Sequence, residues 1–76
     1  MICSAQVRAA RGALAWTASD LAGASGLSLR TIQTIESSGT DQTVRKSSWL
    51  AAKASLEIAG IEFIGTPDDG PGIRLR

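Results

Sequence analysis

Apolar residues recur at intervals of three and four as far as residue 60, which is the period of an amphipathic helix. The segment 3–15 predicts a first helix, and one face of it carries Cys3, Val7, Ala10 and Leu14. Its polar residues lie off that face, and Ser4 is the residue that we expect to cap its start. A core of small and medium-sized apolar side chains is therefore predicted beneath this helix.

Two short helices are predicted next, each with its own start signal. Thr17 and Asp20 have the spacing of a capping box, and Ser28 is a favourable N-cap for the second of the two helices. Gly26 lies in the short connection between them, where a positive φ costs glycine little. The inner sides of the pair carry Leu21, Ala22, Leu27, Ile32 and Ile35. Two helices joined by so short a turn predict a helix-turn-helix unit over 17–37.

A polar run at 37–41 ends this unit and separates it from a fourth predicted helix. That helix spans about 47–59, and its inner stripe consists of Trp49, Ala52, Leu56 and Ala59. Gly60 follows it and suits the left-handed position that often closes a helix. Four helices with short connections thus fill the chain as far as residue 60.

The periodicity changes from helical to alternating beyond residue 60. The runs 61–63 and 73–76 alternate apolar and polar residues, with the Gly- and Pro-rich stretch 65–71 between them. They predict a β-hairpin with a long loop, one face of which carries Ile61, Phe63, Ile73 and Leu75. We expect that face to cover the first and fourth helices, because an isolated hairpin is marginal in water. A secondary expectation is that the remaining strand edge pairs with a second copy in a homodimer.

A chain of this length predicts one mainly α domain over residues 1–76, with a helical core at 4–60 and the hairpin tail at 61–76. Its formal net charge is only +1, from eight Lys and Arg against seven Asp and Glu. That balance is a weak signal for nucleic acid, where a clearly basic face is expected. Besides Arg30, the cations available for phosphate contacts are Arg8, Arg11, Arg45, Lys46, Lys53, Arg74 and Arg76.

Residue types that carry enzyme and metal chemistry are scarce. There is no His, Cys3 is the single cysteine, and no pair of carboxylates has catalytic spacing. We therefore expect a protein that is not an enzyme and has no metal, no cofactor and no small-molecule ligand. A lone cysteine favours the reducing cytoplasm, and no apolar run is long enough to predict a membrane span.

The residues that define the two short helices have the spacing of a known family. The stretch 17–36 reads TASDLAGASGLSLRTIQTIE, and Arg11 precedes it. With Leu21, Gly26 and Ile32 at these positions, the chain resembles the Cro/CI-type (xenobiotic-response-element) helix-turn-helix regulators of bacteria and phages, which have a four-helix lambda-repressor-like domain. The ends of the chain are similar to a small stand-alone subgroup of that family. The resemblance also implies that Arg11 pairs with Glu36 and ties the first helix to the third.

The resemblance implies a transcriptional regulator that binds double-stranded DNA as a homodimer and places the helix 29–37 in the major groove. The residues that would meet base edges are Ser28, Leu29, Arg30, Gln33, Thr34 and Ser37. Arg30 can make a bidentate contact to guanine, and Gln33 one to adenine. Phosphates would be held by Thr17, Arg45 and Lys46, and by the amide ends of the two short helices.

Two positions depart from the family's pattern. The second and third helices usually open with polar side chains that brace each other, and here these positions are Ala18 and Leu29. An exposed Leu29 can touch a thymine methyl group, and it can equally anchor a protein. The alternative hypothesis is therefore an anti-activator that masks a transcription factor. Its contact residues would be Ala18, Leu29, Arg30 and Gln33.

Overall fold

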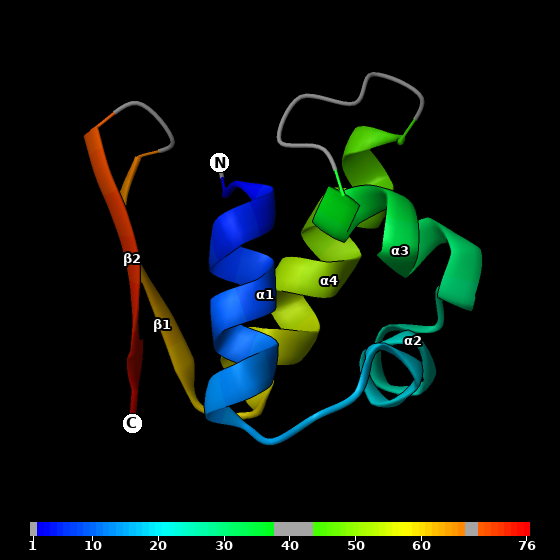
Figure 1. The fold of residues 1–76 in the computed structure, drawn as a ribbon, viewed down its shortest axis with the longest axis horizontal. Coiled ribbons are helices and arrows are strands. Elements are labelled where there is room, and N and C mark those ends of the chain that lie inside the picture. The colour runs from blue at the N-terminus through cyan, green and yellow to red at the C-terminus, as the bar shows by residue number, and fades with distance from the viewer. Residues whose placement is uncertain (1, 38–43, 67–68) are drawn as a thin grey trace.

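Four helices and a two-stranded antiparallel sheet make up the computed structural model, which describes residues 2–37, 44–66 and 69–76 (Figure 1). In chain order they are α1 (Ser4–Ala13), α2 (Ala18–Ser25), α3 (Leu29–Ser37), α4 (Lys46–Ile58), β1 (Ile61–Thr66) and β2 (Asp69–Leu75). The hairpin lies at one end of the molecule and α2 and α3 at the other, with α1 and α4 between them (Figure 1). The prediction of a mainly helical domain with four helices and a C-terminal hairpin is confirmed.

Both ends of α1 differ from the sequence prediction. Cys3, not Ser4, is the N-cap, and its backbone N–H donates to Oε1 of Gln6 at 2.9 Å. Ser4 is instead buried in the first turn, where its hydroxyl donates to a backbone carbonyl of α3. The helix ends at Ala13, because Ala15 has a φ of 57°, a left-handed conformation that a right-handed helix cannot include.

The hydrophobic core lies where the helices meet, and it follows the predicted apolar stripes. Its buried members are Ile2, Val7, Ala10, Leu21, Ala22, Ile32, Ile35, Trp49, Ala52, Leu56 and Ile61. Trp16 and Leu27, which flank the starts of the two short helices, are partly buried against this core. The buried side of α3 carries Ile32, Ile35 and Glu36, so the opposite side of that helix faces solvent.

The connection between α2 and α3 depends on Gly26, which has a φ of 74° as predicted. A residue with a Cβ would be strained in that conformation, although no other atom lies close to the position. The Ser25 hydroxyl donates to the Leu21 carbonyl at 2.7 Å and helps to close α2. Only Leu27 and Ser28 separate Gly26 from α3, so this glycine sets the direction in which α3 leaves.

The boundaries of α3 and α4 lie close to their predicted places. α3 ends at Ser37, and the rest of the expected polar loop lies outside the described residues. α4 follows Arg45 as its N-cap and ends at Ile58, one residue earlier than predicted. Gly60 takes the left-handed position after it, with a φ of 109°.

The hairpin is longer than the sequence prediction. Residues 65–66 and 69–71 of the expected loop are strand, because the ladder continues as far as the pair Thr66 and Asp69. A register shift beside Gly65, whose φ is 73°, allows this continuation. A Cβ on Gly65 would lie 2.3 Å from the carbonyl oxygen of Gly70, so glycine is required there. Residues that look like a loop in sequence therefore form a bulged ladder.

The hairpin packs on α1 and α4, as predicted. Ile61 is fully buried, and Phe63 and Ile73 are partly buried against the helical core. Leu75 shares that face of the ladder as predicted, but the expectation that it is covered is wrong, since it is 51% exposed. Leu75 pairs with Ile61 at the open end of the ladder, where Ile61 takes the buried position.

A buried glutamine joins the hairpin to α1. Gln6 is 2% exposed, and its Nε2 donates to the carbonyls of Ile64 and Gly72 at 3.1 and 2.9 Å. These two residues are paired across the ladder, so one amide group contacts both strands. Because Oε1 of Gln6 also accepts from the N-cap of α1, a single side chain satisfies backbone groups of three segments.

Candidate nucleic-acid interface

The outer side of α3 carries most of the residues predicted to meet base edges. The exposed ones on the helix are Leu29, Arg30, Gln33 and Ser37, and Thr34 is half-buried. The sixth, Ser28, is exposed immediately before the helix. The structure therefore brings the predicted base-contacting set together on one solvent-facing side.

The predicted phosphate contact Thr17 and the predicted base contact Ser28 both use their hydroxyls at helix starts. The Thr17 hydroxyl accepts from the Asp20 N–H at 3.1 Å, while the Asp20 carboxylate accepts from the Thr17 N–H at 2.8 Å. The Ser28 hydroxyl accepts from the Thr31 N–H at 3.1 Å. Both predicted caps are confirmed. Because a carboxylate already occupies the start of α2, this helix end is a poorer phosphate site than the sequence prediction assumed.

The side chains farther along α3 differ in what they can offer a ligand. The Thr34 hydroxyl donates to the Arg30 carbonyl at 3.0 Å, and the Ser37 hydroxyl donates to the Thr34 carbonyl at 3.1 Å. These hydroxyls can still accept a hydrogen bond, but their protons are engaged within the helix. Gln33 has no hydrogen-bond partner among the described residues, so its exposed amide can both donate and accept.

A hollow of about 380 Å³ lies between α3 and the start of α4. Its lining consists of Arg30, Thr31, Thr34, Val44, Arg45 and Ser48. Two of these residues are arginines from different parts of the chain, three carry hydroxyl groups, and none is acidic. The predicted base contact Arg30 and the predicted phosphate contact Arg45 therefore share one surface.

The start of α4 adds to the positive character of this hollow. Arg45 is its N-cap, with an extended backbone and no side-chain capping hydrogen bond, and the first turn contains no acidic residue. The first amides of a helix point outward and carry a partial positive charge. An anion held between Arg30 and Arg45 would therefore also be attracted by the start of α4.

Lys46 does not belong to this surface, although it follows Arg45 directly. It lines a separate hollow of about 220 Å³ together with Ile2, Trp49, Leu50 and Lys53. Successive residues of a helix project about 100° apart, so neighbours in sequence serve different sides. The predicted phosphate pair of Arg45 and Lys46 is thus divided between two hollows.

Two other arginines are committed to internal contacts. Nε and Nη2 of Arg11 donate to the Glu36 carboxylate at distances between 2.9 and 3.1 Å, which confirms their predicted pairing. Nη1 of Arg11 donates to the Trp16 carbonyl at 2.9 Å. Arg8 donates to the backbone carbonyl of Glu36. These two cations hold α1 against α3 and are engaged before any ligand arrives.

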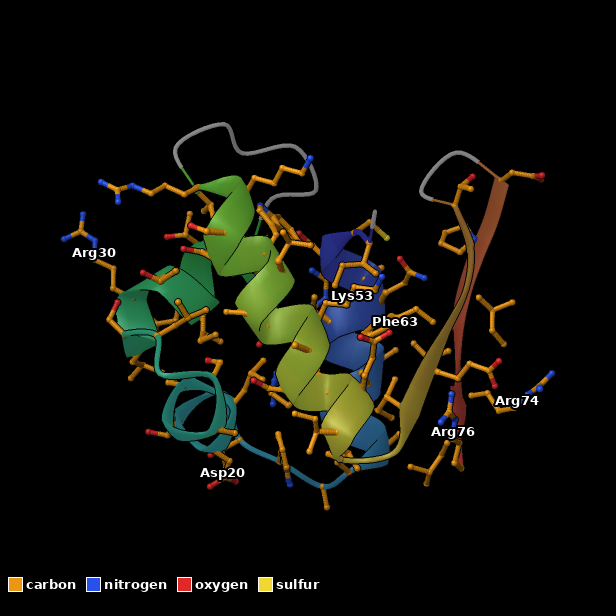
Figure 2. The ribbon with its side chains drawn as sticks, turned by 180° about the vertical axis from the view of Figure 1, so that it is seen from behind. Asp20, Arg30, Lys53, Phe63, Arg74 and Arg76 are labelled. Atoms are coloured by element: carbon orange, nitrogen blue, oxygen red, sulfur yellow. The ribbon has the colours of Figure 1, made fainter. Side chains whose placement is uncertain are left out.

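The arginines of the hairpin lie far from the α3 hollow. Figure 2 shows Arg74 and Arg76 at the opposite end of the molecule from Arg30. Arg74 also forms an ion pair with Glu62 at 3.4 Å. Neither hairpin arginine can therefore join the same local contact as Arg30.

Three lining residues of the hollow, Thr31, Val44 and Ser48, were not predicted as contacts. Thr31 precedes Thr34 by three positions, and Ser48 follows Arg45 by three. Residues at that spacing lie on one side of a helix, so this signal was present in the sequence. Val44 lies before α4 and had no such signal.

The apolar residues that begin α2 and α3, Ala18 and Leu29, differ in their surroundings. Ala18 begins α2 and is partly buried against the core. Leu29 begins α3 and is 42% exposed. Of the residues proposed for a protein partner, Leu29, Arg30 and Gln33 are therefore accessible on α3, whereas Ala18 is largely covered.

Within the described ranges, no group of three or more His, Cys, Asp or Glu side chains is arranged to hold a metal ion. None of the helices in that part of the chain has the length and apolar character of a membrane span. No family model, curated protein or solved structure matches the chain.

Proposed function

We propose that residues 17–37 form a lambda-repressor-like helix-turn-helix and that the chain is a DNA-binding transcriptional regulator of the Cro/CI type. Two short helices, each started by a capping hydroxyl, are joined through Gly26 at positive φ. The second of them exposes a polar side, as a helix that enters the major groove must do. Two copies would place two such helices on a two-fold operator.

The observation that carries this proposal is the hollow shared by Arg30 and Arg45. In the major groove the Arg30 guanidinium can donate to O6 and N7 of one guanine. Arg45 and the start of α4 then lie beside it and can hold a phosphate. Its described lining residues carry two guanidinium groups and no carboxylate, in a chain whose net charge is only +1.

The test begins with selection of genomic DNA fragments by the purified protein at about 50 mM salt. Arg30→Ala should weaken discrimination at one base position by about 1–3 kcal/mol. Arg74→Ala is the matched control, because it removes the same charge from the hairpin and should leave discrimination unchanged. If the wild-type protein selects no DNA at low salt, the proposal fails.

A second candidate function, an anti-activator that masks a transcription factor, is favoured by the exposed Leu29 at the start of α3. An apolar side chain at such a position contributes most when a partner covers it. Leu29→Glu should then abolish binding of the partner that co-purifies after nuclease treatment. Leu50→Glu serves as control, because Leu50 is also exposed but lies on α4. A Leu29→Glu protein that retains its partner would remove this surface from the interface.

A further inference from the structure

The most exposed large apolar side chain among the described residues lies away from the α3 hollow. Ile58, at the end of α4, is 88% exposed. It borders a hollow of about 310 Å³ whose other lining residues are Trp16, Ala24, Ser55 and Ala59. The Ser55 hydroxyl donates to the Ala51 carbonyl at 2.9 Å, so the proton of the one hydroxyl among these lining residues is already engaged. This apolar face shares no lining residue with the α3 hollow.

We propose that a second copy of this chain covers this face, in a two-fold homodimer in which Ile58 of each copy enters the hollow of the other. The same face carries a protruding side chain and an apolar hollow beside it. A two-fold interface requires such self-complementarity, because the same patch is used by both copies. The inference does not rest on DNA binding, since none of these residues lies on the outer side of α3.

The charges at the two sides of this face also favour a second copy of the chain as its partner. α4 contacts α2 on one side and β1 on the other, and Figure 2 shows Asp20 on the α2 side and Arg76 on the hairpin side. The backbone N–H of Arg76 donates to the Gly60 carbonyl at 2.8 Å, which holds this residue beside the end of α4. A two-fold axis that exchanges the two sides brings each Asp20 toward the Arg76 of the other copy. The face is apolar at its centre and oppositely charged at its flanks, so it complements itself.

The shape of the face is also compatible with a second copy. Gly23 and Ala24 are exposed on α2 and carry almost no side chain, so another backbone can approach closely. The proposed interface differs from pairing of the hairpin edge, because it lies across α2 and α4.

Sedimentation velocity of the full chain at about 100 µM tests the proposal, with Ile58→Glu and Leu50→Glu as a matched pair of variants. Leu50 is 54% exposed on the same helix but lines a different hollow. We expect the wild type and Leu50→Glu to be dimers and Ile58→Glu to be a monomer, with a dissociation constant raised about 100-fold. Circular dichroism should show native helix content in all three, because both side chains lie at the surface. A monomeric wild type, or a dimeric Ile58→Glu protein, would overturn the proposal.

Cross-linking gives a second measurement that does not depend on destabilising the interface. In a Cys3→Ser background, Ile58→Cys should form a disulfide-linked dimer on mild oxidation, because each residue 58 lies in the hollow that the other borders. Leu50→Cys in the same background should remain a monomer on denaturing gels. Equal cross-linking of the two variants, or cross-linking of Leu50→Cys alone, would place the interface elsewhere and contradict the proposal.

Discussion

Two groups of arginines lie at the two ends of α3, and they have opposite roles. At its C-terminal end, Arg8 and Arg11 donate to Glu36 and hold α1 against α3. Near its N-terminal end, Arg30 and Arg45 line an open hollow whose described lining residues include no carboxylate, and Figure 2 shows Arg30 extending away from the molecule. The positions of the cations, and not the net charge of +1, therefore decide where this small domain presents arginines to a ligand.

The largest effect is expected where Arg11 is left without its carboxylate partner. The Glu36 side chain is 10% exposed and that of Arg11 is 27% exposed, so Glu36→Ala should lower the free energy of unfolding by about 3 kcal/mol. Glu62→Ala is the matched control. Its pair with Arg74 is longer and more exposed, and its loss should cost no more than about 0.5 kcal/mol. Urea unfolding followed by circular dichroism gives both values, and equal costs would contradict the structural role of Glu36.

A second pair of variants compares an arginine that joins α1 to α3 with an arginine that lines the hollow. Arg8→Ala removes the hydrogen bond to the Glu36 carbonyl and should cost about 1 kcal/mol of stability without changing DNA affinity. Arg45→Ala should do the reverse. The free energy of unfolding should change by less than about 0.5 kcal/mol, because Arg45 is exposed. The slope of log affinity against log salt concentration should fall by about one, because one phosphate contact is lost. If Arg8→Ala flattened the salt dependence as much as Arg45→Ala, the proposed division between the two groups would be wrong.

The smallest effect is expected in the turn that Arg11 supports. Ala15 has a φ of 57°, and Arg11 donates to the carbonyl of the next residue, Trp16. Ala15→Gly should raise the free energy of unfolding by about 0.5 kcal/mol, because the relief of strain at this φ exceeds the conformational entropy that glycine adds to the unfolded chain. Ala9→Gly, in the middle of α1 and also exposed, should lower it by about 0.5–1 kcal/mol. Thermal unfolding of the two variants measures the difference, and the same sign for both would contradict the strain at Ala15.

Features of the fold that depend on neighbouring residues were predictable from the sequence. The capping box of Thr17 and Asp20, the cap at Ser28 and the left-handed Gly26 each involve contacts within a few positions, and the structure confirms them. The extent of the hairpin was not predictable. Glycine and proline are typical of a loop, so the sequence did not predict strand within 65–71. The ladder continues through the register shift beside Gly65, where the backbone of Gly70 lies too close for any other residue.

Contacts between distant segments were the main part that sequence patterns could not reveal. Gln6 reads as a polar residue off the apolar face, yet it is buried because it bonds to carbonyls 58 and 66 positions away. The same limit applies to the candidate site. Helical spacing placed Arg30 on the outer side of α3, but only the packing of α4 against α3 brings Arg45 and Ser48 to that surface.

Amide chemical-shift mapping with a DNA fragment selected by the wild-type protein tests the proposed interface most directly. We expect the largest shifts at Arg30, Thr34, Arg45 and Ser48, which line the hollow between α3 and α4. The amides of β1 and β2, at the other end of the molecule, should hardly move. Shifts concentrated on the hairpin, with none around the α3 hollow, would contradict the proposal that this surface binds DNA.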